Sequence, residues 1–160
     1  MRLEASSTQG VVVPASPAEA LALLADIPES TAHFPSLLSL VAAQGGYTWT
    51  LAPVKVKGIP VQLVYGCRYT IDGSVVSWSP VPDVGNAEVS GTWTVTASGT
   101  GSRLVLENNL ILSVGFPRLF RSVAQSALEA NNAALIAGYV ANLSKTLSGR
   151  PGGRLRAPAR

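Results

Sequence analysis

The sequence is poor in the residues that build metal and redox sites. It contains one cysteine, Cys67, and one histidine, His33, in 160 residues. A single cysteine excludes an intrachain disulfide, and one residue of each kind excludes the usual Cys/His zinc cluster. The Walker A, G-x-S-x-G and H-E-x-x-H patterns are also absent. We therefore predict neither a metal site nor a cofactor.

Charged residues are scarce, and long apolar runs are missing. Charged side chains make up 13% of the chain, about half the usual share. No run of about 18 apolar residues occurs, which excludes a membrane-spanning helix. Residues 1–6 lack the apolar segment of a secretory signal, so we expect a cytoplasmic protein. The 47% of hydrophobic residues then indicates an apolar cavity, a thick core or a dimer face.

Basic charge is concentrated at the C-terminus. Four of the twelve basic residues lie in the last eleven positions, which contain no acid: Arg150, Arg154, Arg156 and Arg160. The rest of the chain has eight basic and nine acidic residues, which is not the charge of a nucleic-acid-binding surface. We predict no specific nucleic-acid partner. We expect one domain, residues 1–147, followed by a flexible basic tail, residues 148–160.

Turn and periodicity signals predict a strand, two short helices, six antiparallel strands and a long helix. Residues 2–13 are typical of a strand. A capping box at 16–19, with a proline in the first helical turn, predicts a helix over 18–26. A second helical turn is expected over 29–33, closed by a phenylalanine and a proline.

The segment 37–114 alternates apolar and polar residues between turns that contain glycine. Side chains two positions apart in a strand lie on the same face, so one set of large residues is expected on one side of the sheet. They are Tyr47, Trp49, Tyr65, Cys67, Tyr69, Trp93 and Asn108. Core packing explains this set, and the alternative is that the face lines a cavity. If the opposite face is concave instead, Arg68 and Glu107 become the interior residues.

A long helix is expected from Pro117 to about Leu147. Polar residues at spacings of three and four predict its solvent face: Arg118, Arg121, Gln125, Glu129 and Asn132. The apolar side is then expected to contain Leu119, Phe120, Val123, Ala127, Ala130 and Ala134, followed by Tyr139 and Leu143. The many alanines leave room for a molecule against this helix.

This order of elements resembles the START-like superfamily, also called SRPBCC, whose helix-grip fold is that of the birch pollen allergens. The capped helix at 16–26 is similar to the family's first helix, and 33–38 to its aromatic-proline turn. The stretch 91–95 followed by 101–104 resembles its glycine-tryptophan hairpin. The resemblance covers residues 2–147 and is nearest to two bacterial groups, the polyketide cyclase/dehydrase-like proteins and the proteins similar to the G-type subunit of carbon monoxide dehydrogenase. It implies an α+β fold with a seven-stranded curved antiparallel sheet, two short helices and one long C-terminal helix.

The resemblance also implies a function, the binding of a small hydrophobic molecule such as a lipid, polyketide or quinone between sheet and helix. Four residues of the last helix region join the aromatic face as its expected lining: Phe116, Phe120, Ala127 and Asn131. Two alternatives stay open, an assembly factor or homodimer without a ligand and a cyclase- or dehydrase-type enzyme. Catalysis needs a general acid or base, and tyrosines, Asp72 or Glu107 would have to serve.

No residue set converges on a reaction, so we assign no catalytic residue. His33 is interpreted as a surface or hinge residue, because its neighbours in one short helical turn cannot form a triad. Cys67, in the middle of a strand, is interpreted as a small buried hydrophobe. We rank ligand binding first, protein interaction second and catalysis third.

Overall fold

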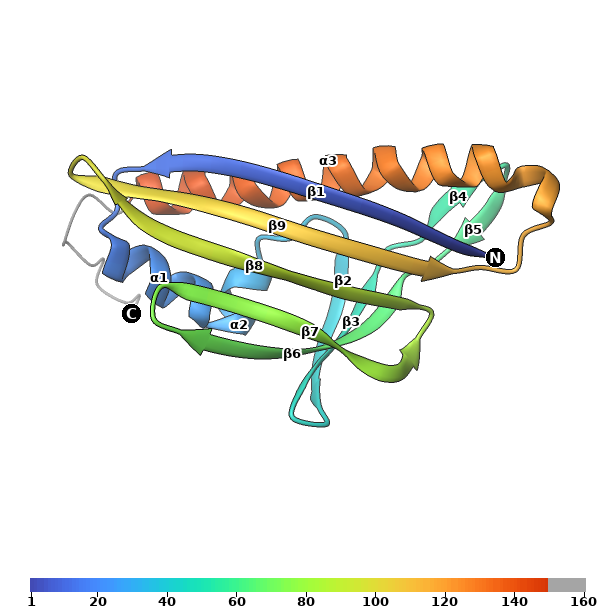
Figure 1. Ribbon diagram of the computed structural model, residues 1–160, viewed down its shortest axis with the longest axis horizontal. Coiled ribbons are helices and arrows are strands. Elements are labelled where there is room, and N and C mark those ends of the chain that lie inside the picture. The colour runs from blue at the N-terminus through green and yellow to red at the C-terminus, as the bar shows by residue number, and fades with distance from the viewer. Residues whose placement is uncertain (150–160) are drawn as a thin grey trace.

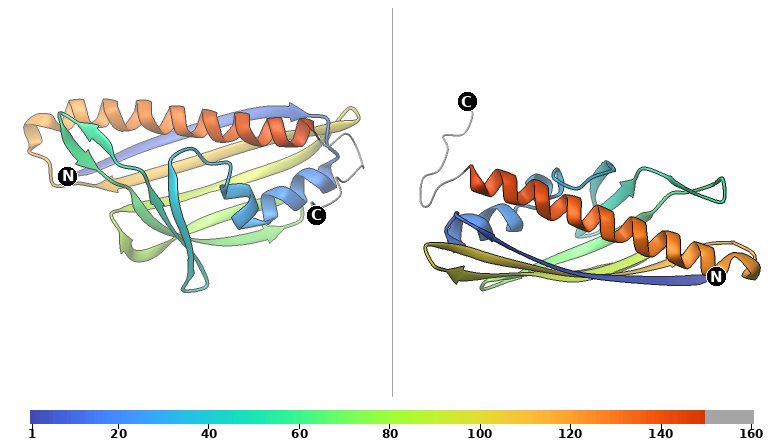
Figure 2. Two further views of the ribbon diagram at one scale, coloured as in Figure 1. Left: turned by 180° about the vertical axis from the view of Figure 1, so that it is seen from behind. Right: turned by 90° about the horizontal axis from the view of Figure 1, so that it is seen from above.

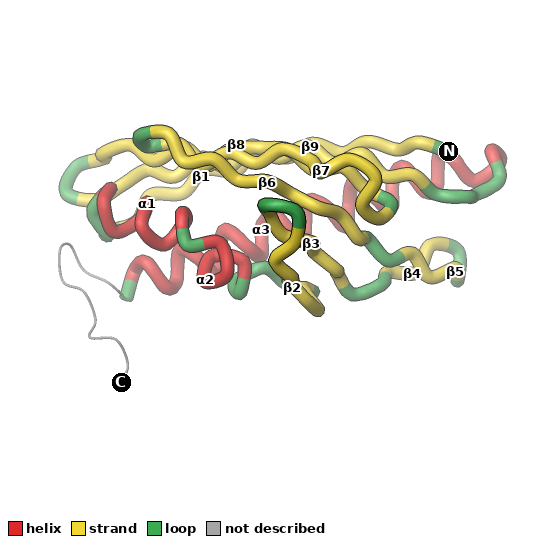
Figure 3. Tube along the Cα trace, turned by 90° about the horizontal axis from the view of Figure 1, so that it is seen from below, coloured by secondary structure: helices red, strands yellow, loops and turns green. Residues whose placement is uncertain are grey.

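The computed structural model describes residues 1–149 and shows a curved antiparallel sheet with the helices on one of its sides (Figure 1, Figure 3). The strands of this sheet are β1 (Arg2–Val13), β2 (Leu37–Ala43), β3 (Gly46–Leu51), β6 (Val64–Asp72), β7 (Val75–Gly85), β8 (Ala87–Ser98) and β9 (Gly101–Ser113), in the order β1-β9-β8-β7-β6-β3-β2. The helices are α1 (Pro17–Ala25), α2 (Ile27–Thr31), the 3-10 turn η1 (Arg118–Phe120) and α3 (Arg121–Ser148). Seven strands, two short helices and one long helix confirm the predicted α+β helix grip.

The first helix begins at the predicted capping box. The Glu19 backbone N–H donates to Ser16 Oγ at 3.2 Å, and the Ser16 backbone N–H donates to Glu19 Oε1 at 3.4 Å. These bonds satisfy backbone donors that a helix leaves free at its start. Asp26 then caps α2, because its carboxylate accepts from the Glu29 N–H at 3.2 Å. Local side-chain chemistry therefore sets where both short helices begin.

A two-stranded hairpin, β4 (Val54–Val56) and β5 (Ile59–Val61), folds away from the main sheet. Apolar and polar residues alternate over 61–71, which indicates one continuous strand, and the structure contradicts this because β6 begins at residue 64. Lys57 and Gly58 both have positive φ, 53° and 78°, as a tight hairpin turn of this kind requires. Pro60 has no N–H to offer a second neighbour, which suits a strand with only one partner. The hairpin lies beside the start of α3 (Figure 2).

The inner face of α3 differs from the predicted one over the first half of the helix. Its buried residues are Ala124, Leu128, Asn132, Ile136, Tyr139, Val140, Leu143 and Leu147. Asn132, expected in solvent, is 6% exposed, whereas Leu119, expected inside, is 83% exposed. Val123, Ala130 and Ala134 are also exposed rather than inside. The prediction failed because alanine is compatible with either face, and because the Asn132 amide donates to Ser7 Oγ at 3.0 Å, which offsets the cost of burying it.

Buried side chains form two clusters along α3. One packs α1 and α2 against the second half of α3, and we call this part, with residues 136–147, the closed end. The other packs the β4–β5 hairpin and the first half of α3 against the sheet. We call residues 54–61 together with 115–128 the hairpin end. The two ends lie at opposite ends of the helix (Figure 1).

Two features that would change the functional interpretation are missing from residues 1–149. None of the helices there is long and apolar enough to cross a membrane. No group of three or more His, Cys, Asp or Glu in the same range is placed to hold a metal ion. The predicted basic tail starts inside α3 at Ser148, and its residues 150–160 lie outside the described part of the chain.

Candidate ligand-binding site

A cavity lies between the sheet, the α1–α2 region and α3. Aromatic and aliphatic residues of β3, β6, β7, β8 and β9 form one wall, and residues of α2 and the middle of α3 form the other. The cavity has a volume of about 50 Å³. A cavity that binds benzene has about 150 Å³, so this one is small.

The structure brings most of the predicted site residues to this cavity. Its lining includes Trp49, Tyr65, Cys67, Tyr69, Trp93, Asn108 and Asn131. Phe116 and Ala127, together with Asn131, line a second, smaller cavity instead. Tyr47 and Phe120 line neither cavity. Tyr47 packs against Tyr69 at a ring-centroid distance of 6.1 Å, and Phe120 precedes the first residue of α3.

Aromatic rings in mutual contact form a continuous arc around the cavity. Trp49 stacks on Tyr65 with ring centroids 5.4 Å apart, and Phe34 meets Trp49 edge-on at 5.3 Å. Phe34 also contacts Tyr139 at 5.2 Å, and Tyr139 contacts Trp93 at 5.8 Å. Such pairs add stability beyond the area that they bury. The arc therefore gives the cavity a stable, flat-sided wall.

The predicted set missed several lining residues, among them the aromatic residues Phe34, Trp78 and Tyr139. Phe34 lies in the aromatic-proline turn after α2, so its position in the family pattern was the signal that could have found it. Trp78 lies opposite Gly91 in the β7–β8 ladder, and a Cβ at Gly91 would come within 2.7 Å of the Trp78 ring. The glycine thus makes room for the indole, a pairing that one strand's pattern cannot reveal.

Several polar groups of the lining are bonded to each other. Ser30 Oγ and Tyr139 Oη are 2.6 Å apart, which ties α2 to α3. Trp49 Nε1 of β3 donates to Tyr69 Oη of β6 at 2.9 Å. A second indole, that of Trp78 on β7, donates from Nε1 to Asn108 Oδ1 of β9 at 3.2 Å. Buried indole N–H groups need such acceptors. These bonds fix the orientation of the aromatic walls.

Three buried side chains keep hydrogen-bonding capacity that no group of residues 1–149 uses. Tyr65, 4% exposed, makes no hydrogen bond with its hydroxyl. Asn108 and Asn132, 8% and 6% exposed, bond through Oδ1 and Nδ2 respectively, which leaves one amide atom of each without a partner in that range. Buried polar groups are normally paired. All three line the cavity, so water or a bound molecule there can pair with their free atoms.

The cavity is neutral at physiological pH. Burial raises the pKa of the Cys67 thiol to about 12, as expected for a small buried hydrophobe. Burial likewise raises the pKa of the Tyr65, Tyr69 and Tyr139 hydroxyls above their usual value. No Asp, Glu, Lys, Arg or His belongs to the lining within the described residues. The site can therefore donate hydrogen bonds from neutral hydroxyl and amide groups but has no charge to offer.

The opposite face of the sheet does not form the interior. Arg68 and Glu107, the alternative interior candidates, are exposed on that outer face, so the alternative is wrong. Asp72, considered as a catalytic carboxylate, is also exposed and lies outside the cavity lining. The inner face is fixed by β9, where Leu104, Leu106 and Asn108 alternate inward with Glu107 outward.

The second cavity lies under the hairpin end and has a volume of about 20 Å³. Val54 and Val56 of β4 line one side, and Phe116 and Ala124 the other. Its lining is apolar apart from Asn131. Asn131 and Leu63 line both cavities, so the two are adjacent.

Comparison with known proteins places the chain among related folds. The family model described as polyketide cyclase/dehydrase and lipid transport matches residues 4–146. A Streptomyces aromatase/cyclase is 18% identical, with 92% of this chain and 99% of that one covered and a TM-score of 0.59. A conserved protein from Geobacillus kaustophilus is 14% identical, with 90% and 95% covered and a TM-score of 0.64.

A START superfamily protein from Mycobacterium smegmatis has the same fold at greater distance, with 11% identity, 90% and 97% covered and a TM-score of 0.53. Identities this low establish the fold alone. Among curated proteins no significant match is found. Of the two groups that the sequence resembles, the matching family model is the cyclase/dehydrase one.

Proposed function

The chain belongs to the polyketide cyclase/dehydrase and lipid transport family, within the START-like superfamily, and we propose that it binds a small, largely apolar molecule between the sheet and α3. The observation that carries the proposal is the set of buried polar groups with unused bonding capacity in an aromatic cavity, namely Tyr65, Asn108 and Asn132. Binding pockets typically combine apolar walls with a few placed polar groups.

The chemistry of the lining selects a neutral ligand with a polar atom. A charged group would lose its hydration without meeting an opposite charge, which costs several kcal/mol or more. The Tyr65 hydroxyl and the Asn108 amide nitrogen donate hydrogen bonds, so a carbonyl or hydroxyl oxygen is the matching ligand atom. The stacked Trp49 and Tyr65 rings provide a flat surface for a planar or cyclic part of the ligand.

The size of the cavity adds a condition. A volume of about 50 Å³ is smaller than the roughly 150 Å³ of a cavity that binds benzene, so a ring-sized ligand must move part of the wall. The hairpin end is the natural part to move, because the second cavity and exposed side chains leave it less tightly packed than the closed end. We therefore expect ring-sized ligands to bind less tightly than their contacts alone would give, because moving the wall costs part of the binding free energy.

Cyclase-type catalysis is the second candidate, favoured by one group in the cavity. The Tyr65 hydroxyl is neutral and without a partner within residues 1–149, so it could polarise a ligand carbonyl as a hydrogen-bond donor. No carboxylate or imidazole lines the cavity in that range. Catalysis would therefore depend on Tyr65 and on the ligand's own reactivity, which ranks it below binding.

Intrinsic fluorescence provides the test, because all three tryptophans of the chain, Trp49, Trp78 and Trp93, line the cavity. We would titrate ketones of increasing size, from butanone to acetophenone, and hydrocarbons of matched shape. We expect a saturable change in emission with the ketones and weaker binding of the hydrocarbons. No saturable change with any probe, together with a native mass equal to the bare chain, would refute the proposal.

Variants locate the bound probe. Tyr65→Phe should weaken ketone binding about two- to tenfold, the usual contribution of one hydrogen bond, and leave hydrocarbon binding unchanged. Tyr47→Phe is the matched control, since Tyr47 lines neither cavity. Val89→Phe should block the cavity, whereas Val12→Phe, at a position 55% exposed, should not. Equal effects of both tyrosine variants would place the probe elsewhere.

A further inference from the structure

Large apolar side chains lie in solvent at the hairpin end. Leu119 is 83% exposed, and Ile59 and Val123 are each 42% exposed. Leu119 and Val123 belong to the start of α3 and the turn before it, whereas Ile59 belongs to the tip of the β4–β5 hairpin. Exposed apolar residues scattered singly need no explanation, but a group on neighbouring segments indicates a contact surface.

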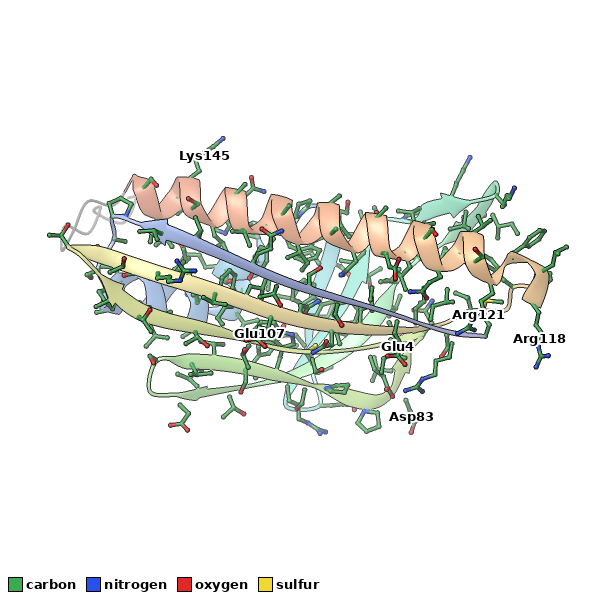
Figure 4. All side chains as sticks on the ribbon, turned by 45° about the horizontal axis from the view of Figure 1, so that its top comes forward. Glu4, Asp83, Glu107, Arg118, Arg121 and Lys145 are labelled. Atoms are coloured by element: carbon green, nitrogen blue, oxygen red, sulfur yellow. The ribbon has the colours of Figure 1, made fainter. Side chains whose placement is uncertain are left out.

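The same two segments carry only positive charge. Lys55 and Lys57 are exposed on the hairpin, and Arg118 and Arg121 are exposed at the start of α3. Figure 4 shows Arg118 and Arg121 at one end of the molecule. None of the four makes an ion pair within the described residues. Neither 50–62 nor 113–124 contains an Asp or Glu.

The nearest acid of the adjoining strand does not neutralise this charge. Glu4 of β1 lies near the start of α3, because Gln125 Nε2 donates to the Glu4 backbone oxygen at 2.7 Å. Its side chain is exposed and alternates with the buried Leu3 and Ala5, so it belongs to the outer face of the sheet. The helix side of the hairpin end therefore stays basic.

We propose that the hairpin end docks on an anionic lipid surface. Lys and Arg near such a surface are attracted to its negative potential, and side chains such as Leu119 and Ile59 gain by entering the boundary between headgroups and acyl chains. A second copy of the chain is disfavoured as the occupant, because four unpaired cations would face four more across the interface. This docking does not depend on what occupies the cavity.

The fold presents the two segments together. The hairpin tip projects through a tight turn at Lys57 and Gly58, and η1 turns the chain into α3 next to it. Between them lies the second cavity, with Val56 on the hairpin side and Phe116 on the helix side. Apolar walls that separate at a lipid surface would meet acyl chains rather than water. Docking would thus lower the cost of opening this end of the molecule.

Vesicle sedimentation with the full chain tests the docking. We would compare vesicles of phosphatidylcholine alone with vesicles of equal parts phosphatidylcholine and phosphatidylglycerol. We expect binding to the anionic vesicles at low salt and its loss in molar salt, where charges are screened beyond a few Å. Binding of equal strength to both vesicles, or none to the anionic ones, would overturn the proposal.

Paired variants assign the binding to the hairpin end. Reversing Arg118 and Arg121 to Glu should weaken binding about thirtyfold or more, given the usual attraction per basic residue. Leu119→Glu should weaken it about tenfold. The matched controls are Lys145→Glu, near the other end of α3 (Figure 4), and Leu38→Glu, a leucine 60% exposed on the edge strand β2, and neither should change binding.

The C-terminal arginines are a competing source of attraction, so a full-length variant with Arg150, Arg154, Arg156 and Arg160 changed to Ser completes the set. Retained vesicle binding by this variant supports the proposal. Loss of binding here, with no loss in the Arg118 and Arg121 variant, overturns it. The cavity probes should bind both variants as they bind the unaltered chain, so a failure of docking and a failure of ligand binding are told apart.

Discussion

The closed end and the hairpin end are built from the same helix and the same sheet, yet they are packed very differently. At the closed end Leu143 and Leu147 of α3, with Leu104 of β9, are all 0% exposed. At the hairpin end Leu119 is 83% exposed, and a second cavity of about 20 Å³ separates β4 from α3. One end of α3 is thus anchored, and the other is placed to move relative to the sheet.

Polar contacts follow the same division. At the closed end the Asn142 amide donates to the His33 backbone oxygen at 2.9 Å, and His33 Nε2 lies 2.8 Å from Thr146 Oγ1. Together with the Ser30–Tyr139 bond, these contacts tie the α2 region to the last turns of α3. His33, interpreted from the sequence as a surface or hinge residue, therefore joins two elements.

Removing one leucine from each end tests the difference in packing most directly. Leu143→Ala should lower the free energy of unfolding by about 2–5 kcal/mol, because it leaves a cavity in a closely packed core. Leu119→Ala should change it by less than about 0.5 kcal/mol, as is usual for an exposed position. Urea denaturation followed by far-UV circular dichroism measures both. Equal losses would mean that the two ends are packed alike in solution.

The parts of the fold that the sequence predicted correctly depend on local or period-two signals. The capping box of Ser16 and Glu19 involves residues three apart, and the structure contains both of its hydrogen bonds. The inward set on β9, including Leu104 and Asn108, follows from strict alternation in an antiparallel ladder. Such signals need no knowledge of distant partners.

The parts that failed depend on tertiary contacts. Asn132 was assigned to solvent because it is polar, but a partner 125 residues away, Ser7, makes its burial favourable. The end of β5 at Val61 looked like the start of β6, since nothing local distinguishes a strand inside the sheet from one beside it. The cavity lining was predicted in part, and the missed Trp78 depends on the facing Gly91.

Stability at high pH tests how tightly the cluster at the hairpin end is packed, because Cys67 belongs to that cluster. Its pKa is raised to about 12 in the folded chain, whereas an unfolded thiol ionises near 8.5. The unfolded state therefore loses this proton first as pH rises. The contribution of Cys67 to stability is complete below about pH 8.5 and is lost between there and about pH 12, with about 2 kcal/mol gone by pH 10.

Denaturation at pH 7 and pH 10 measures this loss, and Cys67→Ala is the control. The variant should lose about 2 kcal/mol less between the two pH values than the unaltered chain. The buried tyrosines, whose pKa values are raised by burial, add a loss common to both proteins above about pH 10. The same pH dependence in both proteins would mean that the thiol is in contact with water, and that the hairpin-end cluster is open.

The smallest expected effect is a gain from filling space. Ala127 lines the second cavity, so Ala127→Leu can place added methyl groups there and should raise the free energy of unfolding by up to about 1 kcal/mol. Ala20 is 0% exposed in the closed-end cluster and lines neither cavity, so Ala20→Leu should lower it by about 1–3 kcal/mol through overpacking. The opposite signs are the test, because alanine and leucine differ equally at the two positions. If both variants lost stability, the second cavity would be closed in solution, and the hairpin end would have no spare volume with which to admit a larger ligand.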